Sequence, residues 1–222
     1  GIRSGDWTMP EEINRKVTDS ITNYFFTTTP EAGENLKNTG VEVNRIHWVG
    51  NTMIDTLIKH RLRFQKPPVW DELNLTKKGY LVMTLHRPAN VDEEEKLKSL
   101  IAEIINNSQD LPLIFPVHPR TARILQSLGI KHERLHTIEP LGYLEFNFLV
   151  ENARAVITDS GGITEETTVM GIPCMTLRDN TERPETVSIG TNELIGTDPR
   201  AIKPAMQILF SGKWKKGTIP EL

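Results

Sequence analysis

The sequence has very little cysteine: Cys174 is the only one among 222 residues. A single cysteine excludes a disulfide within the chain, and its position in the apolar run 172–177 predicts a buried strand residue instead of a nucleophile. Long apolar runs are missing as well, since none approaches the ~20 residues that span a bilayer. We also recognise no signal peptide. We therefore expect a cytoplasmic protein without a membrane partner.

Positive charge is not in surplus either. Lysine and arginine together number 26, against 29 aspartate and glutamate residues, which gives a formal net charge of −3. Nucleic-acid binding normally requires a clustered basic face, so we expect no nucleic-acid partner. Histidine, cysteine and acidic residues do not cluster at metal-ligand spacing, so we expect no metal. The remaining composition, 37% hydrophobic and 25% charged, is typical of a globular protein.

From residue 80 onward, short β-branched and apolar segments alternate with helix-compatible ones. The predicted strands are 80–85, 113–117, 135–138, 155–158 and 174–177, and the predicted helices are 92–105, 120–128, 143–152, one that follows residue 160, and 201–209. Repeated strand–helix units with short connections predict an α/β fold with a Rossmann-like, doubly wound parallel sheet. Ligands of such sheets bind at the carboxyl ends of the strands.

Residues 65–78 interrupt this pattern with a Pro-Pro pair and several charges. They are the best candidate for a linker or domain boundary. Before them we predict helices that begin at residues 10 and 30 and a third over 52–64, with strands over 25–29 and 45–50.

The segment 158–166, Thr-Asp-Ser-Gly-Gly-Ile-Thr-Glu-Glu, carries the clearest functional pattern. It predicts a strand that runs into a turn and then a helix, whose first backbone N–H groups lack internal partners and attract an anion. Gly161 and Gly162 let a phosphate approach the backbone. The Ser160 hydroxyl adds a donor, and Glu166 is placed to accept from sugar hydroxyls. The pattern favours a nucleotide sugar over a nucleoside triphosphate.

Two histidines also follow predicted strands. His86 can bind a phosphate or move a proton, and Arg87 offers donors suited to phosphate oxygens. An equally good interpretation is a loop histidine bonded to backbone beside an exposed arginine. For His118, in the sequence 117–120, a capping and packing role in a tight turn is the stronger interpretation.

Three further segments have functional and structural interpretations. Arg183 lies in the charged run 178–185, which should come up beside the Gly-Gly turn, where it can pair with a diphosphate or with an acid such as Glu166. Phe146 can line a nucleobase pocket, although with Tyr143 at i, i+3 it is equally good core. Glu11, at a predicted helix start, is by itself explained by the helix dipole.

Taken together, these segments resemble the non-hydrolysing UDP-N-acetylglucosamine 2-epimerases. The resemblance rests on segments 9–15, 49–51, 84–87, 116–119, 158–166 and 181–185, which occur in the family's order across nearly the whole chain. It implies a GT-B-like architecture in which two Rossmann-like domains face each other across a substrate cleft. The chain would begin just after a His-x-Glu-Ala-Gly motif, whose final glycine is Gly1. Residues 1–65 would then be a remnant of the amino-terminal domain with a connecting helix, and 66–222 the carboxyl-terminal UDP-binding domain.

The resemblance also implies roles for individual residues. It makes Glu11 and His86 catalytic, and two further acidic catalytic residues would lie in the missing part of the first domain. The implied substrate contacts are Arg87, Phe146, the diphosphate-binding turn Ser160, Gly161 and Gly162, the ribose ligand Glu166, and Arg183. Many family members have Arg-Glu where this chain has Pro88 and Ala89, which puts regulation by substrate in doubt.

The implied reaction interconverts UDP-GlcNAc and UDP-ManNAc without a cofactor. UDP leaves by anti-elimination to give a 2-acetamidoglucal, and it adds back after a proton reaches the opposite face. This chemistry requires an acid and a base near C2 and stabilisation of the departing diphosphate. We expect a homodimeric isomerase of polysaccharide biosynthesis. The alternatives are a hydrolysing epimerase, a GT-B glycosyltransferase, and a nucleotide-binding fragment without activity, which is what we expect of the isolated chain.

Overall fold

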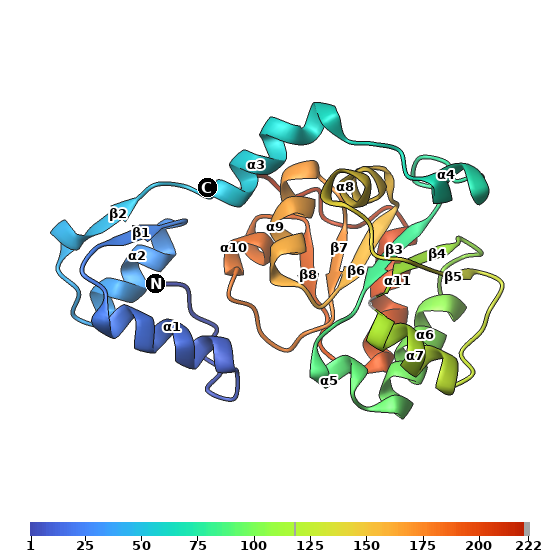
Figure 1. The fold of residues 1–222 in the computed structure, drawn as a ribbon, viewed down its shortest axis with the longest axis horizontal. Coiled ribbons are helices and arrows are strands. Elements are labelled where there is room, and N and C mark those ends of the chain that lie inside the picture. The colour runs from blue at the N-terminus through green and yellow to red at the C-terminus, as the bar shows by residue number, and fades with distance from the viewer. Residues whose placement is uncertain (118, 220–222) are drawn as a thin grey trace.

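A six-stranded parallel sheet organises most of the chain in the computed structural model, which describes residues 1–117 and 119–219, without the side chains of residues 119 and 120 (Figure 1). Its strand order is β5-β4-β3-β6-β7-β8. The strands are β3 (Leu81–Thr84), β4 (Leu113–Pro116), β5 (Leu135–Ile138), β6 (Ala155–Thr158), β7 (Cys174–Thr176) and β8 (Asn192–Leu194). The predicted doubly wound sheet is confirmed, and β8 is a strand that the sequence interpretation did not include.

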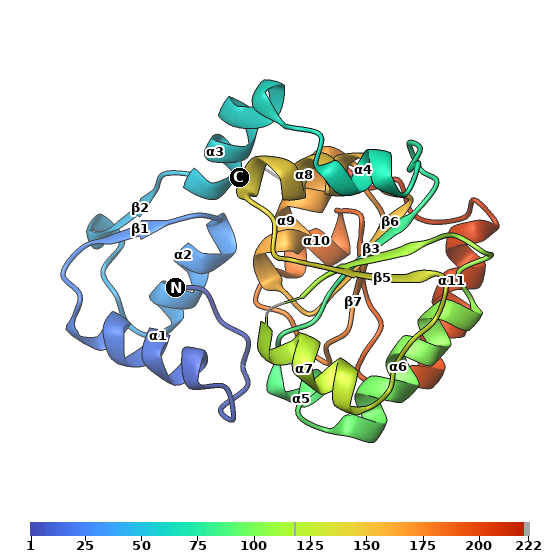
Figure 2. The same cartoon turned by 45° about the vertical axis from the view of Figure 1, so that its right-hand side comes forward.

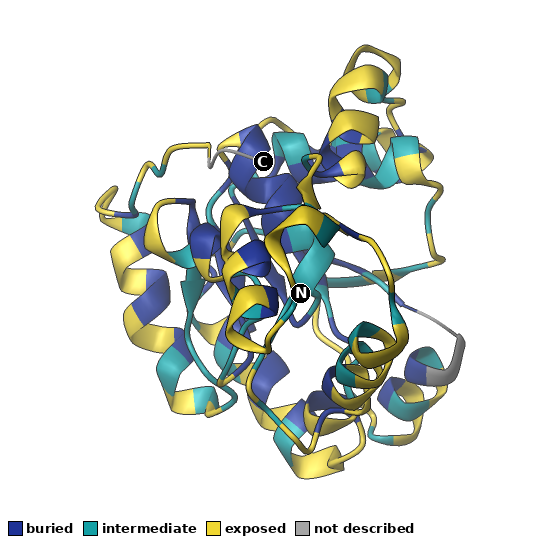
Figure 3. Cartoon of the chain, turned by 90° about the vertical axis from the view of Figure 1, so that its left-hand side faces the viewer, coloured by how far each residue is buried: buried dark blue, intermediate teal, exposed yellow. Residues whose placement is uncertain are grey.

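Helices cover both faces of this sheet (Figure 2). One face carries α6 (Glu94–Asn106), α7 (Pro119–Ser127) and α11 (Ile202–Phe210), and the other carries α8 (Tyr143–Asn152) and α9 (Gly161–Met170). In β3, Leu81 and Met83 pack into the first core cluster and Val82 into the second. Successive strand side chains point to opposite faces, so a strand buried on both sides is apolar throughout. Figure 3 shows the resulting buried interior and exposed outer helix surfaces.

The amino-terminal residues form a smaller unit with its own two-stranded sheet. Its elements are α1 (Pro10–Ile21), β1 (Phe25–Thr27), α2 (Pro30–Asn38), the 3-10 turn η1 (Val43–Arg45) and β2 (Ile46–Trp48). The strands β1 and β2 pair in parallel. On α1 the apolar side chains of Ile13, Val17 and Ile21 are exposed.

The helix α3 (Thr52–His60) connects this unit to the larger sheet and is followed by the 3-10 turn η2 (Arg61–Arg63). Ile54 and Leu57 of α3 are buried in the core cluster beneath α8 and α9. The predicted linker 65–78 contains a short helix, α4 (Pro68–Glu72), because Val69 is buried in the same cluster. The domain boundary at residue 65 stays a prediction.

Three short helices complete the fold and lie near the strand ends: α5 (Pro88–Val91), α10 (Pro184–Ser188) and the 3-10 turn η3 (Pro199–Ala201). Among the helices that the structure describes, none combines the length and apolarity needed to cross a bilayer.

Candidate functional site

The site lies where the order of the strands reverses. The strands β3 and β6 are neighbours at the centre of the sheet, whereas β4 and β5 continue to one side and β7 and β8 to the other. Thr84 and Thr158 are register partners at the ends of β3 and β6, with hydroxyl oxygens 2.7 Å apart. His86 and Ser160 each follow two residues later, so both lie at the switch point where ligands of doubly wound sheets bind.

Asp159 joins the two strand ends. It is fully buried, and its Oδ1 atom lies 2.8 Å from His86 Nδ1. It also accepts the backbone N–H groups of His86, at 3.1 Å, and Arg87, at 2.9 Å, and the side-chain amide of Asn90, at 3.1 Å. Burial alone would raise the pKa of Asp159, but these hydrogen bonds outweigh it and hold that pKa below its ordinary value. The carboxylate is therefore ionised.

This contact assigns the tautomer of His86. With Asp159 ionised, Nδ1 of the neutral ring is the donor, and Nε2 is left as an acceptor. The imidazole is 61% exposed, so Nε2 is available to a ligand. Sequence reasoning named His86 but gave Asp159 no role, although a carboxylate directly after a buried strand was a usable signal.

The start of α9 has the predicted geometry for an anion site. Ser160 is the N-cap residue, and its backbone N–H donates to Thr158 Oγ1 at 3.0 Å. Its hydroxyl does not cap the helix. In the described part of the chain, the N–H groups of Gly161 and Gly162 have no acceptor. A Cβ on Gly161 would lie 2.8 Å from Glu182 Oε1, so a side chain there would have to displace that carboxylate, and one on Gly162 would lie 3.1 Å from the end of the Met53 side chain.

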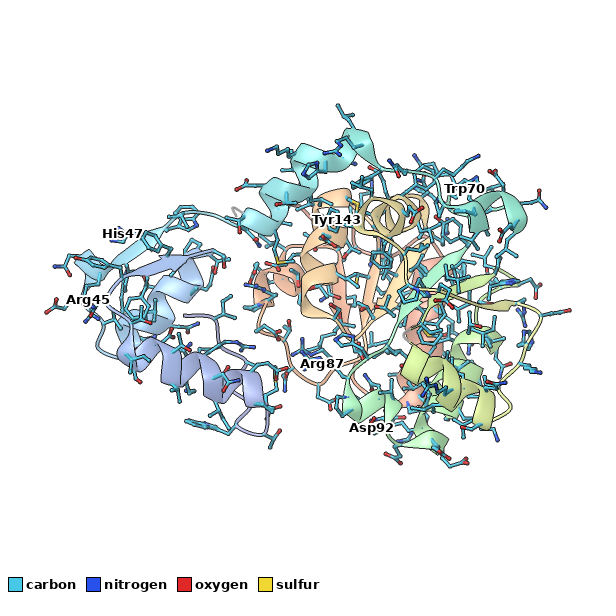
Figure 4. The ribbon with its side chains drawn as sticks, in the orientation of Figure 1. Arg45, His47, Trp70, Arg87, Asp92 and Tyr143 are labelled. Carbon is cyan, nitrogen blue, oxygen red and sulfur yellow. The ribbon has the colours of Figure 1, made fainter. Side chains whose placement is uncertain are left out.

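Arg87 lies beside this helix start. Its Nε atom donates to the backbone oxygen of Asp159 at 3.0 Å, and its Nη2 atom lies 3.9 Å from Glu182 Oε1. Figure 4 shows Arg87 on the side of the larger sheet that faces the amino-terminal unit. The structure therefore brings Arg87 to the same place as Ser160 and Gly161.

Arg183 pairs with Glu165, not with the predicted Glu166. Its Nε atom lies 3.2 Å from Glu165 Oε2, and Asn51 Nδ2 donates to Glu165 Oε1 at 2.7 Å. Burial raises the pKa of Glu165 to about 7, with Arg183 acting against this rise. Neighbouring residues of a helix point about 100° apart, so Arg183 reaches only one of the two glutamates.

Glu166 has a different partner. It is buried and accepts a hydrogen bond from the hydroxyl of Tyr143 at 3.0 Å. Burial raises the pKa of Glu166, and the Tyr143 hydrogen bond opposes this shift. Tyr143 is 41% exposed at the start of α8, whereas Phe146 is partly buried against the core. The structure shows Phe146 packed against the core. A contact between Phe146 and the substrate stays a proposal.

Glu11 lies on α1, and its side chain is exposed and has no hydrogen bond or ion pair in the described part of the chain. Its neighbour Glu12 is fully buried and accepts from the Ser4 backbone N–H at 2.9 Å and from Arg15 Nη1 at 2.9 Å. Glu12 is therefore tied to the fold, whereas Glu11 is free to meet a ligand. No contact joins Glu11 to His86 among the residues that the structure describes.

The amino-terminal unit nevertheless touches the segment that follows β7. Asn180 Nδ2 donates to Asp6 Oδ2 at 3.0 Å, and Arg15 Nη2 lies 4.0 Å from Glu182 Oε1. Arg183 Nη1 also reaches Thr28 Oγ1 at 3.5 Å. The helix that carries Glu11 is thus held against the charged run 178–185.

The structure does not describe one of the predicted residues. His118 lies outside the described residues, as do the side chains of its two successors. Among the described residues, no group of three or more His, Cys, Asp or Glu side chains is arranged to hold a metal ion.

Comparisons with known proteins identify the family and the fold. The family model for UDP-N-acetylglucosamine 2-epimerase matches residues 1–218. The UDP-N-acetylglucosamine 2-epimerase of Methanocaldococcus jannaschii is 41% identical over 97% of this chain and 62% of its own length. A UDP-2,3-diacetamido-2,3-dideoxy-D-glucuronate 2-epimerase of Pseudomonas aeruginosa is 39% identical over 88% of this chain and 55% of its own.

A solved structure shows the same architecture. The M. jannaschii UDP-GlcNAc 2-epimerase in complex with UDP-GlcNAc and UDP superposes with a TM-score of 0.85 at 40% identity, over 98% of this chain and 63% of that one. The chain thus spans less than two thirds of the length of these relatives, and its α/β fold is GT-B-like. On the family match and the 41% identity, the chain belongs to the UDP-N-acetylglucosamine 2-epimerase family.

Proposed function

We propose that the protein to which this chain belongs is a UDP-GlcNAc 2-epimerase that interconverts UDP-GlcNAc and UDP-ManNAc. The observation that carries the proposal is the convergence of His86, Ser160 and the open start of α9 at the switch point of the sheet. The support from relatives is that proteins with this fold and these segments are named for the same activity.

In the proposed reaction, the C2–H bond and the C1–O bond to the diphosphate break, and a C1–C2 double bond forms. UDP then adds back to C1 after a proton has reached C2 from the opposite face, so that atoms and electrons balance without a redox step. The free N–H groups of Gly161 and Gly162 and the charge of Arg183 would stabilise the departing diphosphate. Glu11 would move the proton, with His86 as the second proton-transfer group.

The experiment that tests this proposal is incubation of the whole protein that the gene encodes with UDP-GlcNAc in D₂O. We expect deuterium at C2 of both the recovered substrate and UDP-ManNAc. Free ManNAc with released UDP would instead identify a hydrolysing epimerase. Transfer of the sugar to an acceptor with C2 unlabelled would identify a glycosyltransferase, and UDP binding without turnover would leave only a binding module.

One relative supports a second substrate. Because the P. aeruginosa relative is named for a diacetamido-glucuronate sugar, the same exchange experiment should include UDP-2,3-diacetamido-2,3-dideoxy-D-glucuronate. Faster C2 exchange with that sugar would move the assignment to it. We also propose a homodimer in the cytoplasm, with family membership as the support; light scattering and cell fractionation test both.

A further inference from the structure

A buried arginine near the start of α9 has one donor nitrogen without a partner among the described residues. Arg178 follows β7, and its side chain is only 4% exposed. Its Nη2 atom donates to Glu182 Oε2 at 2.6 Å, whereas its Nη1 atom is buried and has no partner among the described residues. This Nη1 atom lies 3.6 Å from the position that a Cβ on Gly161 would take. A buried unpaired donor is unfavourable, so the arrangement points to an acceptor that arrives from outside.

The carboxylate of Glu182 lies beside both Arg178 and Gly161. Its Oε1 atom lies 2.8 Å from the Cβ position on Gly161, 3.9 Å from Arg87 Nη2 and 4.0 Å from Arg15 Nη2. Burial alone would raise the pKa of Glu182, but the hydrogen bond and charge of Arg178 outweigh it and lower that pKa. One ionised carboxylate is therefore surrounded by arginines from three segments, next to a helix start whose N–H groups are free.

We propose that Glu182 is an internal anion that occupies the diphosphate-binding place of the unliganded protein. An incoming diphosphate repels this carboxylate and takes over its contacts with Arg178 and Arg87, and the unpaired Nη1 donor of Arg178 then gains a partner. Binding is thus an exchange of one anion for another. The inference rests on the proposed function, because it assigns a diphosphate to the start of α9, and it adds that Glu182 weakens the binding of that group.

The test measures the binding of UDP and of inorganic pyrophosphate by calorimetry at low salt. The proteins are the whole wild-type protein, Glu182→Gln, and Glu151→Gln as a matched control. Glu151 forms an Arg–Glu pair of the same length, 2.6 Å to Arg61, on the far end of α8. Loss of a negative charge this close to a diphosphate should tighten both ligands about fivefold or more in Glu182→Gln. Glu151→Gln should bind like the wild type.

A second variant guards against misfolding. Glu182→Asp keeps the charge that Arg178 needs but withdraws it from Gly161, so it should fold and bind pyrophosphate more tightly than the wild type, though less than Glu182→Gln. Unchanged or weaker pyrophosphate binding in either folded variant overturns the inference. Wild-type protein that binds pyrophosphate but not UDP overturns the proposed function instead, and the comparison of variants with pyrophosphate still decides the role of Glu182.

Discussion

His86 Nδ1 lies 2.8 Å from Oδ1 of Asp159, a fully buried carboxylate on the neighbouring strand end. The same carboxylate holds the backbone N–H groups of His86 and Arg87, so it fixes both the ring and the loop that carries it. A histidine positioned in this way presents a single nitrogen to a ligand. The geometry therefore predicts that Asp159 acts as a positioning residue, through His86.

Asp159→Asn should lower kcat for C2 exchange by at least about tenfold, because an amide can hold the wrong imidazole tautomer. If Asp159 acts through His86, the double variant with His86→Gln should lose little more than His86→Gln alone. Steady-state kinetics of the four proteins measure this. Asp110→Asn is the control, since Asp110 pairs with Arg134 at 2.9 Å on the surface. Fully additive losses would contradict the positioning role.

The large sheet was predictable from sequence because its strands are buried on both faces. Runs such as residues 81–84 and 155–158 are apolar or β-branched throughout, and each is followed by a helix-compatible segment. The strand β8, Asn-Glu-Leu, has no such pattern. It forms because Asn192 is buried and its Oδ1 atom accepts from Thr176 Oγ1 at 2.6 Å on β7, a contact that no local pattern encodes.

The site was predictable to the level of segments but not of partners. His86 and Ser160 could be predicted to lie at the same edge of the sheet, because both follow strands of one parallel sheet. The pairing of Arg183 with Glu165, and not with Glu166, depends on the rotation of α9 about its axis and on Asn51, the N-cap residue of α3. Glu182 and Arg178 stood within a charged run, and their meeting at Gly161 depends on how the loop after β7 folds back.

Gly161→Ala should raise the dissociation constant for UDP about tenfold or more, a loss of about 1.4 kcal/mol. The added methyl group would lie 2.8 Å from Glu182 Oε1 and 3.6 Å from Arg178 Nη1, where the proposed diphosphate would also approach. Gly33→Ala in α2 is the matched control. Its Cβ would lie 3.6 Å from Ile46 Cγ2, which is an ordinary van der Waals contact. Calorimetry with UDP measures the difference, and equal affinity of the two variants would contradict a close diphosphate.

Glu165→Gln should gain stability relative to the wild type as the pH rises. Burial raises the native pKa of Glu165 to about 7, from the ordinary value of 4.5, so the folded protein binds the proton more tightly than the unfolded chain. Stability from this group is present below pH 4.5 and is lost as the pH rises through 7. The advantage of the variant should therefore grow between pH 5 and 8, by up to about 3 kcal/mol.

Urea unfolding of Glu165→Gln and the wild type at several pH values measures this change. Glu151→Gln is the control, because Glu151 is partly exposed in its pair with Arg61 and an exposed pair contributes little at any of these pH values. A constant difference between Glu165→Gln and wild type over this range would show that Glu165 is ionised throughout, with Arg183 outweighing burial.

Glu166→Gln should reduce the preference of the protein for UDP over deoxy-UDP. A ribose hydroxyl that donates to the Glu166 carboxylate makes a charge-assisted hydrogen bond, which corresponds to a preference of about tenfold or more. The neutral amide makes a weaker bond, so the preference should shrink to about threefold.

The 2′-deoxy and 3′-deoxy analogues, titrated separately, identify the hydroxyl concerned. Tyr143→Phe is the informative control: it removes the 3.0 Å hydrogen bond to Glu166 Oε1 and keeps the carboxylate, so it should preserve the preference. An undiminished preference in Glu166→Gln would place the ribose elsewhere, and the carboxylate would then serve only to bind Tyr143 between α8 and α9.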